Sequence, residues 1–376
     1  METDEDLSTQ KLSSVIMALD PISTSYERPE AIIRIFLCVL VFYVPVIIVT
    51  NVLVIVTVYL VRKLHTPDNY VIAGLASADC LVGIWSLPLY ILSDIPQTMP
   101  LIRSKRWTCA MRYIAFTVSQ DSSLSILTLM CVDRFTSINW PFWYQMHVTN
   151  KAMLVAISVI YTAHTTKALV VYGLLMRFDE TIEPLHNRCT VLNNAPHFYI
   201  LQFCTAELGL QLSVSFCLCA QVSLTALREV RKLKREFHVL GISGTFRSKS
   251  YRSRMTNVKI TVSLMFIFII LWLPTAFGGV MSKLVSRRVA NIYRISTRLP
   301  RLANSFLNAV VYAFSKDTYR KAYWYLLTTP PYRWARLEEM MRSSEAFSSN
   351  MLASKLRKTT MDLASTSQRI VVGTED

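Results

Sequence analysis

Charged residues are scarce in this chain. Of its 376 residues only 17% are Asp, Glu, Lys or Arg, whereas 52% are hydrophobic and the mean hydropathy is +0.34. A soluble domain carries about 25% charged residues, so the composition argues against a soluble protein and indicates a membrane protein. The sequence also lacks internal repeats, which argues against a transporter or channel. It lacks paired aspartates or His-Glu metal spacing within the apolar runs, which argues against a membrane enzyme.

Long apolar segments account for the hydropathy. A helix needs about 20 apolar residues to cross a bilayer, and six segments reach that length. They are Ile35–Val61, Tyr70–Leu92, Tyr113–Val132, Ala152–Met176, Phe198–Leu227 and Ile260–Ser282. A seventh candidate, Leu302–Ser315, is short and follows several arginines. These runs predict an all-α membrane protein with six clear spans and one weaker span.

The distribution of Lys and Arg predicts the orientation in the membrane. The segment between the fifth and sixth spans carries ten basic and two acidic residues, whereas the first thirty residues carry seven acidic and two basic ones. We therefore expect an extracellular N-terminal tail (1–30), a seven-transmembrane domain (31–328) and a cytoplasmic tail (329–376). The tail is predicted to be disordered apart from a short helix around Tyr332–Met341. The net charge of +15 is then largely topological, and no nucleic-acid partner is expected.

The N-terminal segment carries no cleavable signal peptide that we can identify, because no apolar core precedes Ala31. The eight cysteines divide by position. Six lie inside apolar runs, whereas Cys109 and Cys189 lie at expected outer ends. Because the extracellular side is oxidising, a Cys109–Cys189 disulfide is expected; two free thiols are the alternative.

An acid and an arginine end the third span. Asp133-Arg134 is followed by Phe135, at a boundary where ionised groups are costly unless they pair or bind something. Other motifs lie in order along the chain. They are Asn51, Leu64–Tyr70, Leu75–Asp79, Trp107-Thr108-Cys109, Phe268 with Trp272 and Pro274, Asn308–Tyr312 and Phe314–Lys321. Together, from about Asn51 to Tyr319, these motifs resemble the rhodopsin-like (class A) G-protein-coupled receptors. Pro141–Tyr144 points weakly to the biogenic-amine branch.

The resemblance implies a seven-helix bundle with a short amphipathic eighth helix in the plasma membrane. It implies a receptor, not an enzyme, that passes ligand binding to a heterotrimeric G protein through outward movement of the sixth helix. Arrestin and a receptor kinase are further expected partners, besides membrane lipid. The residues that match the family's coupling switch are Asp133, Arg134, Phe135 and Tyr312. Those that match its toggle are Phe268, Trp272 and Pro274, and the proline should kink its helix.

The resemblance also implies a sodium and water pocket. Asp79, Ser123, Asn304 and Asn308 occupy its positions, and a hard cation such as Na⁺ prefers oxygen ligands of this kind. A protonated Asp79 bonded to Asn308 without an ion is the alternative. No other cofactor is expected. Retinal is not expected either, because Leu302 stands where opsins carry their lysine.

The ligand class stays open between an amine, a peptide and an anionic metabolite. Phe116 stands where amine receptors of the family place an aspartate, and the other pocket candidates are Gln120, Asp121, Glu207, Trp272 and Arg298. The two carboxylates could bind a cationic ligand group, or Lys167 could neutralise one of them as a structural ion pair. Arg294, Arg298 and Arg301 form a basic rim, which fits an anionic ligand or side chains that reach the headgroups.

Several positions depart from the family pattern. They are Phe135, Ile160, Gln211, Cys219 and Ala309. In the family, a tyrosine at the place of Cys219 helps to hold the arginine in the active state. A receptor-like seven-helix protein with lost or biased G-protein signalling is therefore the alternative, ahead of a transporter or channel.

Overall fold

The computed structural model describes residues 30–95, 97–98, 106–178, 195–239, 249–277, 281 and 284–344. The chain divides into two units, Met1–Phe42 and Tyr43–Asp376, and the division falls inside helix α2 (Glu30–Leu60). The second unit contains the remainder of α2 and all later helices. Its described residues form helices joined by short turns and contain no strand.

Seven helical segments of the described residues follow the predicted spans. Between α2 and the eighth helix come α3 (Pro67–Leu81) with η2 (Val82–Ser86) and α4 (Leu87–Asp94), then α6 (Arg106–Asn139), α8 (Asn150–Phe178), α9 (Ala195–Val239), α10 (Lys249–Ala276) and α13 (Arg298–Ser315). Five described stretches are long and apolar enough to cross a membrane: Arg34–Leu60, Pro67–Ser93, Ala110–Asn139, Asn150–Tyr172 and Val258–Thr275. The helical architecture is thus the seven-helix membrane bundle that the sequence predicts.

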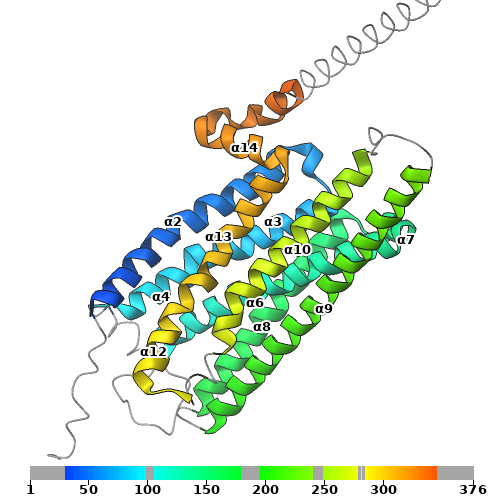
Figure 1. The fold of residues 1–376 in the computed structure, drawn as a ribbon. Helices are drawn as coiled ribbons and strands as arrows, with labels where there is room; N and C mark the ends of the chain where they lie inside the picture. Colours follow the sequence, from blue (N-terminus) through cyan, green and yellow to red (C-terminus); the bar gives the residue numbers. More distant parts are fainter. Residues whose placement is uncertain are drawn as a thin grey trace, which may run out of the picture. The chain divides into compact units, whose positions relative to one another are not determined.

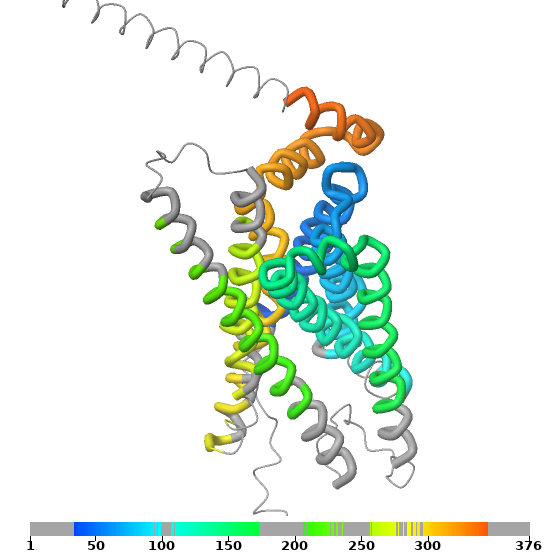
Figure 2. The backbone as a smooth tube through the Cα atoms, turned by 90° about the vertical axis from the view of Figure 1, so that its right-hand side faces the viewer, coloured from blue at the N-terminus to red at the C-terminus, as the bar shows by residue number. Residues whose placement is uncertain are grey.

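Helix α6 is the centre of the bundle. It packs against α3, α8, α9 and α10, and Figures 1 and 2 show it lying among them. The shared core contains the fully buried side chains Leu75, Leu127, Leu264 and Phe268. Large apolar side chains such as Val159 are exposed on the outer faces. Apolar residues on both faces of a helix are what a lipid environment requires.

The second membrane helix is locally widened. Five residues, Val82–Ser86, form a π-helical turn between α3 and α4, and Pro88 lies in the first turn of α4. A proline removes one backbone donor, and single π turns commonly accommodate such an interruption. A Cβ on Gly83 would lie 2.9 Å from Ile48 Cγ1, so this turn also allows the second helix to approach α2 closely.

The eighth helix, α14 (Asp317–Thr328), turns away from the end of α13 (Figure 1). Its buried residues are Tyr319, Ala322 and Leu326, whereas Trp324 is exposed, as an amphipathic surface helix requires. A 3-10 helix (η4, Pro331–Arg336) and a further helical turn at residues 337–344 follow. Leu337 and Met341, one helical turn apart, are buried in the main core. These helical residues overlap the short helix that the sequence predicts around Tyr332–Met341.

Candidate functional site

Asp133 and Arg134 form a closed pair at the end of α6. The Arg134 guanidinium donates through Nε (2.8 Å) and Nη2 to Asp133 Oδ2, and both residues are buried. Tyr144, on the short helix α7 (Pro141–His147), donates its hydroxyl to Asp133 Oδ1 at 2.6 Å. Burial and the nearby Asp133 carboxylate raise the pKa of Tyr144, so its phenol remains a donor. Both carboxylate oxygens of Asp133 are therefore engaged.

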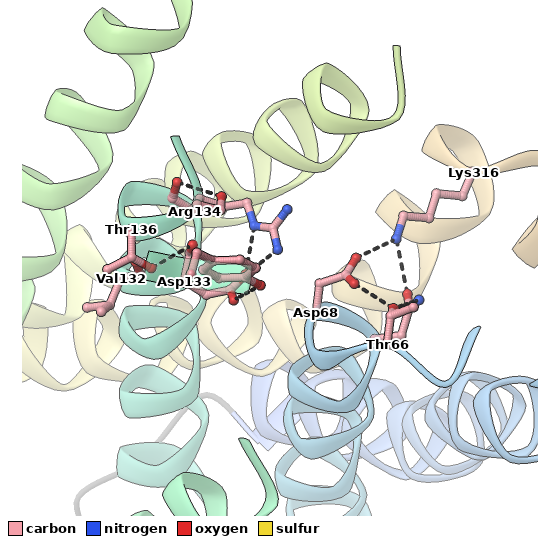
Figure 3. Close-up of polar contacts among 10 residues, drawn as sticks. Thr66, Asp68, Val132, Asp133, Arg134, Thr136 and Lys316 are labelled. Carbon is pink, nitrogen blue, oxygen red and sulfur yellow. Dashed lines mark hydrogen bonds and ion pairs between the residues drawn. The ribbon is translucent and has the colours of Figure 1, made fainter. Parts of the chain in front are cut away.

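A second charged group lies beside this pair. Figure 3 shows Asp68, in the first turn of α3, between the Arg134 guanidinium and Lys316. Lys316 Nζ lies 3.5 Å from Asp68 Oδ2 and donates to Asn69 Oδ1 at 3.1 Å. The Tyr319 hydroxyl also donates to Asn69 Oδ1, at 3.0 Å. Burial, with a further contribution from the Arg134 charge, lowers the pKa of Lys316, although Asp68 acts in the opposite direction.

The sequence did not predict this second group. Leu64–Tyr70 and Phe314–Lys321 are both motifs of the sequence, but nothing in either segment indicates that Lys316 meets Asp68 and Asn69. Two other switch candidates lie apart from the acid pair. Phe135 makes an edge contact with Trp140, with ring centroids 5.6 Å apart. Tyr312 is buried beside Tyr319, at 5.8 Å between ring centroids, and its hydroxyl has no hydrogen-bond partner.

Asp79 is fully buried in the middle of the bundle. Asn308 Nδ2 donates to its Oδ2 at 2.7 Å, and Ser123 Oγ donates to its Oδ1 at 3.3 Å. Asn304 is also buried, and its Oδ1, like Asn308 Oδ1, has no hydrogen-bond partner. The carboxylate thus receives neutral donors, while buried amide oxygens remain free to accept. A buried carboxylate without a counter-charge is costly, so the site requires a proton or a cation.

These oxygen atoms suit a hard cation such as Na⁺ better than a transition metal. The described residues hold no group of three or more His, Cys, Asp or Glu side chains able to bind a metal. Helices α3, α6 and α13 supply the four predicted residues. Asn51 connects α2 to the same region, because its Nδ2 donates to Ser305 O at 2.8 Å.

The toggle residues lie together on α10. The rings of Phe268 and Trp272 stack with centroids 5.1 Å apart and planes 16° apart, and both side chains are buried. Pro274 lies two residues further along the same helix. Its carbonyl accepts a hydrogen bond from the Tyr293 hydroxyl at 2.6 Å, which ties α10 to α12 (Arg287–Ser296).

Lys167 binds both carboxylates that the sequence marks as ligand candidates. Its Nζ lies 2.5 Å from Asp121 Oδ2 and 2.9 Å from both oxygens of Glu207. Because the three residues belong to α8, α6 and α9, this triad joins three helices. Of the two interpretations left open by the sequence, the contacts favour the structural ion pair. Close by, Gln211 donates to Ser125 Oγ at 2.5 Å and His164 Nε2 lies 2.7 Å from the same atom.

The remaining pocket candidates meet at the end of the bundle where α13 begins. The Arg301 guanidinium lies over the Phe116 ring at 4.8 Å and over the Trp272 ring at 5.5 Å. Arg298 lies over the Tyr90 ring at 4.7 Å. Gln120 is buried one helical turn from Phe116. The sequence had placed Arg301 on the basic rim only. The expected Cys109–Cys189 disulfide lies outside the described residues.

A seven-helix membrane bundle with a closed acid-arginine pair at the end of its third helix is typical of membrane receptors. The chain matches the model of the 7 transmembrane receptor (rhodopsin family) over residues 50–312. Because this match covers more than half of its length, the chain belongs to that family. It is therefore a multi-pass membrane receptor and not an enzyme.

Individual relatives support the same placement. Trace amine-associated receptor 9 of Mus musculus is 26% identical, over 72% of this chain and 78% of its own length. Melatonin receptor type 1B-B of Danio rerio is 23% identical, over 81% of this chain and 84% of its own. The 5-hydroxytryptamine receptor 1B of Felis catus is 33% identical over a shorter stretch, 30% of this chain and 28% of its own. These similarities place the chain close to the biogenic-amine branch of class A.

Proposed function

We propose that this protein is a plasma-membrane receptor, with its N-terminus outside, that transmits binding of an extracellular ligand to a heterotrimeric G protein. The observation that supports this function best is the closed Asp133–Arg134 pair, with Tyr144 on the second carboxylate oxygen. A buried ion pair is expensive to break by removing one partner. It is therefore suited to hold an arginine until a conformational change releases it.

The transmitting element is α10. Ligand contact with Trp272 changes the Phe268–Trp272 stack, and the Pro274 kink lets the helix pivot there. Because α10 packs against α6, α9 and α13, its pivot opens the bundle beside Arg134. The released arginine then meets the G protein. This is a two-state transition in which the ligand biases one arrangement.

Asp79, Ser123, Asn304 and Asn308 hold a sodium ion in the inactive state. The ion supplies a positive charge that keeps the buried Asp79 carboxylate ionised. The free Oδ1 atoms of Asn304 and Asn308 support this assignment. Asn308 also belongs to α13, so loss of the ion would loosen the contact between α3 and α13 that its amide makes with Asp79.

Arrestin and a receptor kinase are proposed as further partners, acting on the hydroxyl-rich C-terminal segment. One observation favours a second candidate function, a receptor with biased or lost G-protein signalling. Cys219 is buried in the core and offers no hydroxyl to the released Arg134. The two candidates differ in whether G-protein activation survives.

Nucleotide exchange on a panel of purified G proteins tests the proposal. The receptor in lipid nanodiscs should accelerate exchange on at least one G protein, and Arg134→Ala should abolish that acceleration. Arg342→Gln, at an exposed arginine in the final helical turn, is the matched control. Exchange that survives Arg134→Ala would refute the assigned role of Arg134. Silence of the native receptor with every G protein would favour the second candidate.

A further inference from the structure

We propose that Arg301, Trp272 and Gln120 form a subsite for the carboxylate of an aromatic acid ligand. The inference rests on the proposed function in that it names the ligand class of the same receptor. It differs from what the names of the amine-receptor relatives suggest.

Arg301 carries a charge that nothing in the described residues neutralises. Its guanidinium contacts the aromatic faces of Phe116 and Trp272, and its Nε is buried without a hydrogen-bond partner. No Asp or Glu of the described residues forms an ion pair with it. Cation–π contacts offset only part of the cost of desolvating an unpaired ion. The site is therefore arranged to receive an anion.

The other unsatisfied groups nearby are also donors. Trp272 Nε1 and Gln120 Nε2 are both buried and have no hydrogen-bond partner. Gln120 lies one helical turn along α6 from Phe116, and Trp272 contacts the same guanidinium as Phe116 does. Three donor groups without acceptors lie around one pair of aromatic rings. A carboxylate supplies two acceptor oxygens and a negative charge, and it pairs with a guanidinium in bidentate fashion.

Two simpler explanations of Arg301 do not fit. A side chain that extends to the lipid headgroups keeps its charged end in water, yet Arg301 Nε is buried. Neutralisation by Asp121 and Glu207 also fails, because both are already bound by Lys167. An ammonium ligand would meet the like charge of Arg301.

Two further arginines contact an aromatic ring at this end of the bundle. The guanidinium groups of Arg112 and Arg298 both lie over the Tyr90 ring, at 5.0 Å and 4.7 Å. The Phe116, Trp272 and Tyr90 side chains surround these guanidinium groups with aromatic rings, which favours an aromatic acid over an aliphatic one. Because Arg301 contacts Trp272, a carboxylate that draws the guanidinium would change the packing of that tryptophan directly.

A matched trio of probes tests the charge preference. Binding of 3-phenylpropanoate, 3-phenylpropylamine and 3-phenylpropanol to the purified receptor in nanodiscs is followed by saturation-transfer NMR, without G protein. The acid should bind, and the amine and alcohol should bind much more weakly. Arg301→Gln should weaken the acid about tenfold or more, since a charged hydrogen bond contributes about 1.5–3 kcal/mol. Arg301→Lys should retain part of the affinity, and Arg342→Gln should leave it unchanged.

Trp272→Phe supplies a second test at a different donor. It keeps an aromatic ring but removes Nε1–H, so it should weaken the acid several-fold while leaving the alcohol unaffected. Preference for the amine, absence of acid binding, or an acid affinity that Arg301→Gln does not change would overturn the proposal. Because no G protein is present, a failure here is separate from a failure of the Arg134 exchange test.

Discussion

Phe116 shows how one residue redirects the chemistry of a receptor pocket. Where amine receptors of the family carry an aspartate, this chain places an aromatic ring, and the charged group that contacts the ring is the cation Arg301. In the proposed subsite the charge beside this position is therefore positive, whereas an amine receptor of the family would present a negative one. Two other single residues, Tyr144 and Asp79, are proposed to stabilise the inactive state of the bundle, and each leads to a direct test.

Tyr144→Phe should raise the basal activity of the receptor. The variant removes the 2.6 Å hydrogen bond to Asp133 and keeps the ring. A hydrogen bond to a charged group contributes about 1.5–3 kcal/mol, so the closed pair should open more often. Ligand-free nucleotide exchange is the measurement, and Tyr325→Phe, at a tyrosine on α14 away from the pair, is the control. Basal exchange equal to that of the native receptor would exclude this role for Tyr144.

Asp79→Asn should remove a sodium-dependent gain in stability. An ion that binds only the folded state raises its stability by mass action. The melting temperature of the native receptor should therefore be higher in sodium chloride than in choline chloride at equal ionic strength. The variant should melt at the same temperature in both salts. Equal melting of the native receptor in both salts would instead support a protonated Asp79 without an ion.

At the scale of the helices, the Lys167 triad joins α6, α8 and α9. The helix α9 has Gln211 in place of a proline, and Gln211 donates to Ser125 on α6. The helix α8 has Ile160 in place of a tryptophan. In this chain the polar contacts at the interface of α6, α8 and α9 include the triad and the neighbouring His164–Ser125 contact.

Lys167→Met should lower the thermal stability of the receptor markedly. The change leaves two partly buried carboxylates beside each other; breaking a fully buried pair typically costs about 3–5 kcal/mol, which is the upper bound for this site. Adding Asp121→Asn and Glu207→Gln should recover much of the loss, because both unpaired charges are then gone. Thermal unfolding in nanodiscs is the measurement, with Lys151→Met at an exposed position of α8 as control. A stability that is unchanged by Lys167→Met would show that the triad is not structural.

The sequence predicted the membrane helices well where their composition was uniform. Apolar runs of full length marked most of them, since the bilayer requires such runs. The seventh helix was weak in this respect because Arg298 and Arg301 lower its hydropathy, and the structure shows these side chains over aromatic rings. The π turn at Val82–Ser86 left no signal apart from Pro88.

Across the whole molecule, the sequence motifs identified candidate residues, but they predicted few of the contacts between those residues. Asn308 was expected beside Asp79, and the two are hydrogen-bonded. Tyr144 as the partner of Asp133, and Lys316 as the partner of Asp68, could not be foreseen. Each pair joins segments that only the folded bundle brings together, over separations that no sequence period encodes.

In the proposed mechanism, α10 moves away from α6 when the G protein binds. Its most direct test is the distance between nitroxide-bearing amino acids at Asn139 on α6 and Lys259 on α10, both exposed. Double electron–electron resonance should show this distance increasing when nucleotide-free G protein binds the native receptor, and remaining short in Arg134→Ala. A distance that stays constant while the receptor catalyses nucleotide exchange would contradict the account.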